Sequence, residues 1–269
     1  MQWQNAIPTL LEPIIALPRL GLVTDVDGTI SPIVDQPDDA QVTPRSRDLL
    51  QQLVQHLPLV AVISGRAADD VRARVGVEGV VYVGNHGLEW WVEGQIELAP
   101  GAQQFRPALA AALYEAQAAQ LPGMLVEDKG ATLSIHYRNT PDPQAAHETF
   151  TPIVQRIAAA HGLSLFQGRM VYELRPPVAI NKGSAFAQLI TRYGLEAAFY
   201  LGDDTTDADA LQKARELRTA GACAALGLGV TAEETPQVVY DSADVLVPGV
   251  TGVESFLAWL LEARSASST

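Results

Sequence analysis

The chain has 269 residues, of which 48% are hydrophobic and 18% are charged, and its formal net charge is −13. This length supports a large core in one or two domains, and the composition excludes a disordered protein. The strong negative charge disfavours nucleic acid and anionic membranes as partners. An anionic ligand would therefore need a local cluster of positive groups.

Cysteine content and the N-terminal segment indicate the compartment. Cys223 is the one cysteine, which excludes an intrachain disulfide and a multi-cysteine metal site. Residues 1–20 lack a basic n-region and contain prolines, unlike a signal peptide, and no apolar run is long enough to span a bilayer. We therefore expect a cytoplasmic protein and assign no role to this first segment.

Short apolar segments alternate with helix-like segments at both ends of the chain. In the first hundred residues we expect strands at Leu22–Thr24, Leu59–Ile63 and Val80–Val83, helices at Val42–Leu57 and Ala67–Val75, and a hairpin over Glu89–Leu98. Near the C-terminus we expect strands at Ala198–Leu201, Cys223–Leu226 and Val245–Val247, and helices at Asn181–Tyr193, Thr206–Thr219 and Gly252–Glu262. Buried strands separated by helices predict an α/β fold with a Rossmann-like parallel sheet.

The middle of the chain has a different pattern, a helix followed by two strands, which occurs twice. The expected elements are helices at Gln104–Gln120 and Pro143–Ala160, and strands at Met124–Glu127, Ala131–Tyr137, Leu163–Phe166 and Val171–Leu174. We interpret residues 101–178 as an inserted α+β domain, within a core formed by residues 1–100 and 179–269.

Polar clusters follow four of the expected core strands. They are Asp25–Thr29, Ser64–Arg66, Gly84–Gly87 and Gly202–Asp207. Ligands of open α/β sheets bind beyond the carboxyl ends of the strands, so we expect all four clusters to face one site.

The charges in these clusters point to a metal ion and a phosphate. The carboxylates expected to converge are Asp25, Asp27, Asp203, Asp204 and Asp207. Clustered carboxylates repel one another unless a cation compensates them, and a small set of oxygen ligands favours Mg²⁺. Lys182 precedes a predicted helix, where a cation and free amides suit a phosphate, and Ser64 and Thr29 add hydroxyl donors.

The motifs DVDGT, a strand ending in Ser64, Lys182 before a late strand, and GDDTTD together resemble haloacid dehalogenase (HAD)-type phosphatases. The resemblance implies that Asp25 is the nucleophile, which forms an aspartyl-phosphate, and that Asp27 is the general acid and base. It also implies that Ser64 and Lys182 bind the phosphoryl oxygens.

The same resemblance implies a Mg²⁺ site held by Asp25, Asp203 and the backbone carbonyl of Asp27, with Asp204 and Asp207 just behind these ligands. The two neighbouring acids then need different protonation states. We expect bound Mg²⁺ to keep Asp25 ionised and charge repulsion to help Asp27 hold its proton.

Further stretches narrow the resemblance to trehalose-6-phosphate phosphatases. They are ISGR (63–66), GNHG (84–87), EDKGATLSIHYR (127–138) and ELRPPVAINKG (173–183). The resemblance implies that the insert acts as a cap domain in which Glu127, Lys129 and Glu173 hold the distal glucose. It places the side chains of Arg66, Asn85, His86 and Arg138 near the sugar or the phosphate.

Three alternatives stay open on sequence alone. A phosphohexomutase of the same superfamily would need arginines in the insert, such as Arg138, Arg169 and Arg175, although carboxylates and Lys129 are more prominent there. A phosphatase for another sugar phosphate is harder to exclude, because a few hydrogen bonds to hydroxyls decide such specificity. A non-catalytic binding module is disfavoured because the core motif residues are all present.

Overall fold

The computed structural model describes residues 1–34, 39–168 and 170–266. The chain divides into two compact units, one formed by Met1–Ile96 with Ile180–Thr269 and the other by Glu97–Ala179. The second unit contains the segment 101–178, which the sequence assigns to an inserted domain. We call the first unit the core unit and the second the insert.

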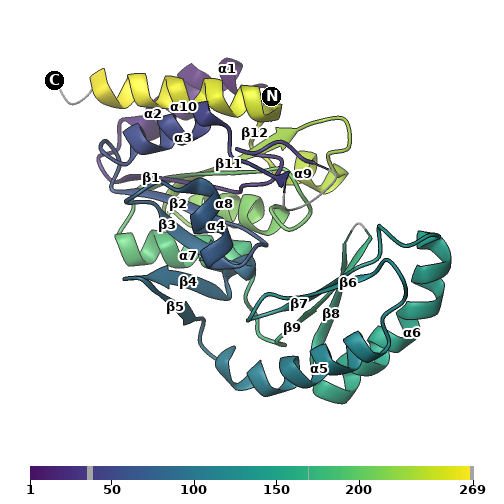
Figure 1. Cartoon of the computed structure of the whole chain (residues 1–269). Coiled ribbons are helices and arrows are strands. Elements are labelled where there is room, and N and C mark those ends of the chain that lie inside the picture. The colour runs from purple at the N-terminus through teal and green to yellow at the C-terminus, as the bar shows by residue number, and fades with distance from the viewer. Residues whose placement is uncertain (35–38, 169, 267–269) are drawn as a thin grey trace. The chain divides into compact units, whose positions relative to one another are not determined.

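The core unit is built on an eight-stranded sheet in the order β12-β11-β10-β1-β2-β3-β4-β5 (Figure 1). Its parallel strands are β1 (Leu20–Thr24), β2 (Leu59–Ile63), β3 (Val81–Gly84), β10 (Ala197–Gly202), β11 (Ala224–Thr231) and β12 (Val245–Pro248). Two further strands, β4 (Glu89–Val92) and β5 (Gln95–Leu98), extend one edge, and β4 runs antiparallel to β3. The prediction of an α/β fold with a parallel sheet is confirmed.

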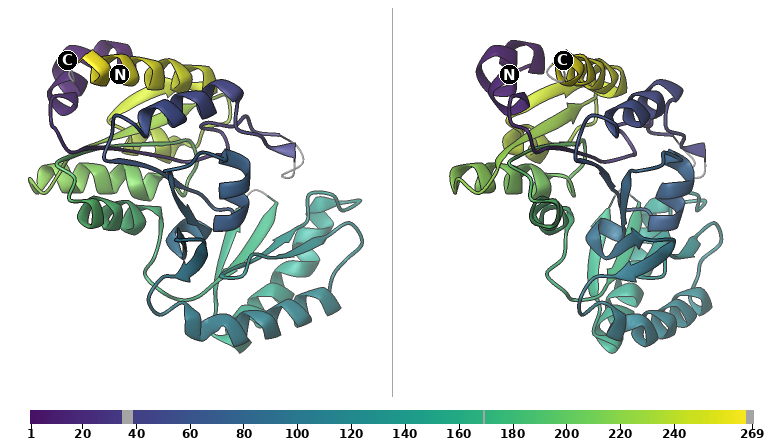
Figure 2. Two further views of the ribbon diagram at one scale, coloured as in Figure 1. Left: turned by 60° about the vertical axis from the view of Figure 1, so that its left-hand side comes forward. Right: turned by 90° about the vertical axis from the view of Figure 1, so that its left-hand side faces the viewer.

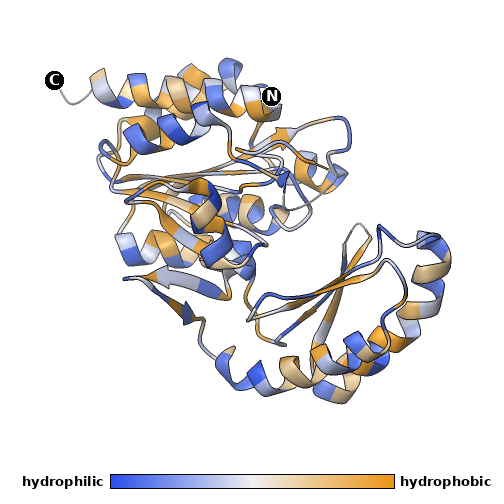
Figure 3. Ribbon diagram, viewed as in Figure 1, coloured by the Kyte–Doolittle hydropathy of each residue, from blue (hydrophilic) through white to orange (hydrophobic). Residues whose placement is uncertain are grey.

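Helices cover both faces of this sheet. Apolar residues of α3 (Pro44–Leu53), α4 (Ala68–Val75) and α10 (Gly249–Ala266) pack on one face, and those of α7 (Lys182–Tyr193), α8 (Ala208–Thr219) and α9 (Gln237–Ser242) pack on the other. Figure 3 shows the apolar residues concentrated on the strands and the polar residues on the outer sides of the helices. Strands buried on both faces explain the uninterrupted apolar runs in the sequence.

Three short helical segments at the N-terminus are absent from the sequence-based expectations. They are α1 (Trp3–Ala6), a π-helical turn (Ile7–Leu11) and α2 (Glu12–Ile15). Pro8 and Pro13 each stand in the first turn of a helical segment, where proline is tolerated, so they do not prevent this structure. The segment packs beside α10 (Figure 2). In this contact the centroids of the Trp3 and Phe256 rings lie 5.5 Å apart.

Strand β11 continues beyond the end that the sequence predicts and includes two glycines. The strand continues through Gly227 and Gly229, both buried, to Thr231. A Cβ atom on Gly227 would lie 3.1 Å from the Cα atom of Leu211, so the missing side chain lets α8 pack close to the sheet.

Among the described residues, no helix is long and apolar enough to cross a membrane.

The insert is a four-stranded antiparallel sheet with two helices on one face. The strands run in the order β6 (Leu125–Asp128), β7 (Leu133–His136), β9 (Val171–Arg175) and β8 (Ser164–Gly168). A 3₁₀ turn (Gln103–Phe105) leads into α5 (Arg106–Ala118), and α6 (Pro143–His161) follows β7. Phe150, Ile135 and Leu174 are fully buried between the helices and the sheet, so the insert has a hydrophobic core of its own.

We expect Phe150→Ala to lower the free energy of unfolding by about 3–5 kcal/mol, because it removes a fully buried aromatic ring and leaves a cavity. Chemical denaturation followed by circular dichroism measures the loss. Tyr114→Ala is the control, since Tyr114 lies on α5 with 76% of its surface exposed. Similar losses in both variants would contradict a separate core in the insert.

Candidate functional site

Two acidic loops leave the core sheet side by side. Strand β1 pairs in parallel with β10, with Thr24 opposite Leu201, and the N–H of Asp25 donates to the carbonyl of Leu201 at 2.9 Å. Asp25 directly follows β1 and Asp203 directly follows β10. The pairing of these strands therefore brings together motifs far apart in the sequence.

Three carboxylates gather at this point. One oxygen from each of Asp25, Asp203 and Asp207 lies within 4.8 Å of the others, and Thr29 donates to Asp203 at 3.1 Å. Gly28 makes room for them, because a Cβ atom there would lie 2.0 Å from Asp203 Oδ2. Its φ of +79° also suits glycine, so two constraints favour glycine at this position.

Lys182 is the buried cation of the cluster. Asn181 caps helix α7 by accepting from the Ser184 N–H at 2.8 Å, which makes Lys182 the first residue of the helix. Its Nζ lies 2.8 Å from Asp207 Oδ1 and 3.1 Å from Asp25 Oδ1. Burial lowers the pKa of Lys182, but the two carboxylates outweigh burial and raise it overall, so the ammonium stays charged.

Burial also acts on the carboxylates. Desolvation, followed by the charge of Asp207, raises the pKa of Asp25 well above its usual range. The same two causes raise the pKa of Asp203 to about 7. Buried carboxylates that resist ionisation, with oxygen-only donors, fit a hard divalent cation, which would compensate their charge in place of protons. The cluster of Asp25, Asp203 and Asp207 could therefore hold such a cation.

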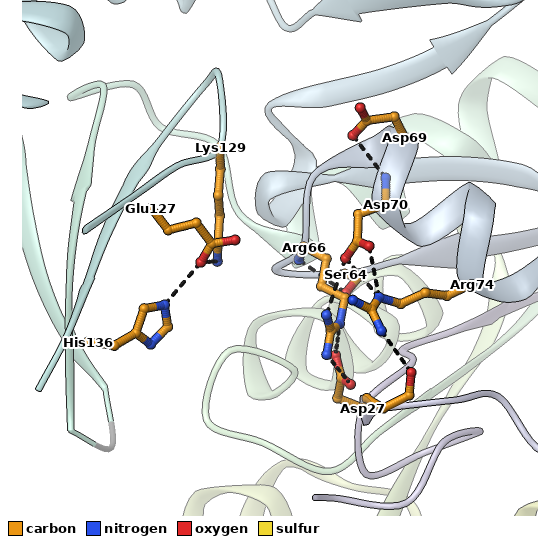
Figure 4. A network of polar contacts seen from close by, with 10 residues as sticks. Asp27, Ser64, Arg66, Asp69, Asp70, Arg74, Glu127, Lys129 and His136 are labelled. Carbon is orange, nitrogen blue, oxygen red and sulfur yellow. Dashed lines mark hydrogen bonds and ion pairs between the residues drawn. The ribbon is translucent and has the colours of Figure 1, made fainter. Parts of the chain in front are cut away.

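Asp27 has a different environment from Asp25, because it lies against Arg66, as Figure 4 shows. The Arg66 guanidinium donates from Nε and Nη2 to the two oxygens of Asp27, at 2.7 and 2.9 Å. Burial lowers the pKa of Arg66 and the hydrogen bonds to Asp27 raise it, with a net increase. A positive charge thus lies against Asp27, where the sequence led us to expect only the negative charge of Asp25.

Not all five expected carboxylates enter the cluster. The side chain of Asp27 faces Arg66, and Asp204 is exposed, with its backbone N–H donating to Asp207 at 3.1 Å. Asp207 occupies a central position instead, since it accepts from Lys182 and from the Tyr200 hydroxyl, which lies 2.6 Å away. The reason is local: the turn after β10 directs Asp207 inward and leaves Asp204 at the surface.

The loops after β2 and β3 are joined by backbone hydrogen bonds. Asn85 donates to the carbonyl of Arg66 at 2.7 Å, and His86 donates to that of Ser64 at 2.9 Å. Asn85 and His86 have φ values of 47° and 58°, an uncommon conformation for residues other than glycine, and both are buried. Ser64 is also buried, and its Oγ accepts from the Arg66 N–H at 3.2 Å.

In the insert, a polar row crosses the sheet on the face opposite the helices. Glu127, Ser134 and Glu173 lie in register on three neighbouring strands. His136 Nε2 lies 3.0 Å from Glu127 Oε2, and Lys129 Nζ lies 3.9 Å from the same oxygen (Figure 4). Strand β6 ends before Lys129, but its N–H still donates to the carbonyl of Thr132, which continues the pairing.

The row continues onto the outer strand β8. Phe166 pairs with Glu173, whose carboxylate accepts from Arg175 Nε at 3.0 Å, and the Arg175 guanidinium lies 4.5 Å from the centre of the Phe166 ring. Arg138 follows β7 and is exposed, whereas Arg169 lies outside the described residues. The insert thus presents carboxylates and cations together on one face.

Two residues of the core site escape sequence reasoning. Tyr200 lies within an apolar strand, and its hydroxyl carries the one polar atom of that side chain, so a buried partner could be suspected but not identified. Asp70 lies on α4 and accepts from Arg66 Nη1 at 3.2 Å. The spacing of four residues between Arg66 and Asp70 is a sequence signal for this contact. Ordinary ion pairs on helix surfaces have the same spacing, so the signal does not identify a site.

Solved structures share this fold. A haloacid dehalogenase-like hydrolase from Bacteroides thetaiotaomicron has a TM-score of 0.63 at 15% identity and covers 90% of this chain and 99% of its own. The C-terminal domain of Candida albicans trehalose-6-phosphate phosphatase has a TM-score of 0.74 at 22% identity and covers 95% of this chain and 96% of its own. The chain therefore has the fold of HAD-like hydrolases.

Sequence comparison narrows the class further. The family model of trehalose-phosphatase matches residues 23–237, so the chain belongs to the trehalose-phosphatase family. Trehalose-phosphate phosphatase from Mycobacterium marinum is 37% identical over 210 residues, or 73% of this chain. Trehalose-phosphate phosphatase B from Arabidopsis thaliana is 30% identical over 263 residues, or 91% of this chain and 67% of that protein.

Some relatives are much longer than this chain. The match spans 52% of the Mycobacterium marinum protein. It spans 17% of a Mycobacterium tuberculosis protein named uncharacterized glycosyl hydrolase, to which the chain is 35% identical over 234 residues. Family membership is thus established for the matched residues 23–237.

The raised pKa values predict how pH and metal affect stability. The pKa of Asp203 rises from 3.8 to about 7 on folding, so folding opposes its ionisation, and stability falls as pH rises between those values and stays low above them. Asp25 acts in the same direction. A bound divalent cation offsets this loss, so MgCl₂ should raise the melting temperature more at about pH 8 than at about pH 5.

Thermal melts in EDTA and in excess MgCl₂ measure this difference. Asp203→Asn is the control, because it removes a candidate ligand and an ionisable group together, and it should abolish most of the pH-dependent increment. An increment in the wild type that is independent of pH would contradict the proposed cation site.

Proposed function

We propose that the protein hydrolyses trehalose 6-phosphate to trehalose and inorganic phosphate. The observation that carries the proposal is the buried Asp25 at the end of β1, paired with Lys182 and grouped with Asp203, in a chain of the trehalose-phosphatase family. The single buried Cys223 and the small anionic substrate fit an enzyme of the cytoplasm, the location that we propose.

The proposed reaction has two steps. An Asp25 oxygen attacks phosphorus, the bond from phosphorus to the sugar oxygen breaks, and Asp27 gives a proton to that leaving oxygen. Asp27 then takes a proton from water, whose oxygen attacks the aspartyl-phosphate and releases phosphate and the free Asp25 carboxylate. The balance is one phosphate ester and one water consumed, and one alcohol and one phosphate formed.

Two side chains and a metal ion would stabilise the phosphoryl group. Lys182 supplies a buried charge beside Asp25, and Ser64 supplies a hydroxyl at the end of the neighbouring strand β2. Mg²⁺ would be held by Asp25, Asp203 and the backbone carbonyl of Asp27, and it would supply charge neutralisation of the phosphate oxygens when bound. Asp207 and Asp204 would support that site, Asp207 through its hydrogen bond to Lys182.

Recognition of the sugar is assigned to the insert. Glu127, Lys129 and Glu173 lie on the face of its sheet opposite the helices, and such carboxylates and amines offer several hydrogen bonds to neutral hydroxyls. Arg138 would contribute near the sugar or the phosphate. In the core unit we assign Asn85, His86 and Arg66 to the surroundings of the phosphate ester; the first two lie in the buried loop after β3.

Purified protein should release phosphate from trehalose 6-phosphate in a Mg²⁺-dependent reaction, and much faster than from glucose 6-phosphate. A panel of sugar phosphates assayed for phosphate release measures this preference. Asp25→Asn should reduce turnover at least about 10³-fold, because the amide is a poor nucleophile. Asp48→Asn is the matched control, since Asp48 lies exposed on α3 of the core unit. Faster turnover of glucose 6-phosphate would exclude the proposed disaccharide substrate.

Variants in the insert test the recognition of the sugar. Lys129→Ala and Glu173→Gln should each lower kcat/KM for trehalose 6-phosphate by about 10–100-fold, because hydrogen bonds to sugar hydroxyls are lost. Turnover of p-nitrophenyl phosphate, which has no sugar, should change less than about threefold. Glu148→Gln on α6 controls for the loss of a charge from the insert. Equal losses on both substrates would place these residues outside sugar recognition.

A further inference from the structure

Asp70 lies between two guanidinium groups beside the candidate acid (Figure 4). It accepts from Arg66 Nη1 at 3.2 Å on one side and from Arg74 Nε at 2.8 and 2.9 Å on the other. Arg66 in turn holds both oxygens of Asp27. Negative and positive side chains therefore alternate along one ion-pair network, which starts at Asp27 and ends at Arg74.

The local fold holds this ion-pair network in place. Asp70 lies in the first turn of α4 and Arg74 four residues further on, so their side chains lie on the same side of the helix. Arg66 lies just before the helix, and its Nη1 reaches Asp70 from there. Arg74 Nη1 also donates to the carbonyl of Ala40 at 2.8 Å, in the segment between β1 and α3. Arg74 thus holds Asp70 from the side opposite Arg66. Arg66 itself is largely buried, with 13% of its side chain exposed.

We propose that Asp70 is a positioning residue that holds the Arg66 guanidinium in the orientation in which it grips and orients the Asp27 carboxylate. An arginine side chain is long and has many rotamers, so the two hydrogen bonds to Asp27 fix it less well alone than together with a third bond, to Asp70, from another direction. The inference rests on the proposed function, in which Asp27 transfers a proton to and from the reacting oxygens.

Asp70 acts through Arg66 and Asp27, so its loss should affect turnover more than substrate affinity. Asp70→Asn keeps the shape of the side chain and removes the charge that anchors Arg66. We expect kcat for trehalose 6-phosphate to fall about tenfold with KM unchanged within about twofold, since small misplacements of a reacting group slow catalysis strongly.

The neighbouring residue provides a matched control. Asp69 lies on the same turn of α4, is exposed, and accepts from the N–H of Asp70 at 2.8 Å, a bond that asparagine can also accept. Asp69→Asn removes the same charge near the same helix N-terminus and should leave kcat within about twofold of the wild type. An equal loss in both variants, or a rise in KM with kcat unchanged, would overturn the proposal.

A double-mutant cycle with Arg66 tests the route of the effect. Lysine retains the charge but cannot donate to Asp27 and Asp70 in a fork, so Arg66→Lys already breaks the connection. In that background Asp70→Asn should add less than about a twofold loss of kcat, whereas independent roles would give multiplied losses. Arg74→Lys loosens Asp70 from the side opposite Arg66 and should give a smaller loss of kcat in a folded protein. This variant tests the proposal if Asp70→Asn proves unstable.

The two proposals fail in different ways. If the wild type is inactive on trehalose 6-phosphate but hydrolyses another ester of the panel, the proposed substrate is wrong, and the same variants are compared on that ester. If the wild type hydrolyses trehalose 6-phosphate and Asp70→Asn matches it in kcat, the positioning role of Asp70 is wrong.

Discussion

The core site depends on the burial of Lys182 among carboxylates. Three ionised carboxylates at Asp25, Asp203 and Asp207 against one ammonium would leave two negative charges uncompensated in a desolvated place. Burial of unpaired charge is costly, and the raised pKa values of Asp25 and Asp203 express that cost. A divalent cation would cancel both remaining charges, so the architecture that buries Lys182 also creates the demand for a metal ion.

The sheet explains why these groups meet. Strand β1 lies between β10 and β2, so the residues after its carboxyl end have Asp203 on one side and Ser64 on the other. Helix α7 then delivers Lys182 from its first position, where the Asn181 cap fixes the start of the helix. Rigid strand ends and one capped helix hold the cluster, which limits the reorganisation needed when charge develops on a substrate.

Periodicity and strand-end motifs predicted the parallel sheet, most element positions, and the meeting of Asp25 with Lys182 and Asp203, because pattern and topology determine them. Side-chain direction within loops is not determined in this way. Asp204 and Asp207 lie three residues apart in the same turn, yet one is exposed and the other is fully buried. The short N-terminal helices were also missed, since their stability comes from packing against α10 and not from local pattern.

The two aspartates of the DVDGT motif have different partners and different burial. Asp25 has 6% of its side chain exposed and is paired with a buried lysine, whereas Asp27 has 37% exposed and is held by an arginine fork. The two acids of this motif therefore lie in electrostatic environments that differ in both burial and cation partner. Arg66 comes from the segment after β2 and Lys182 from helix α7, so two different elements of the core unit supply the cations that distinguish Asp27 from Asp25.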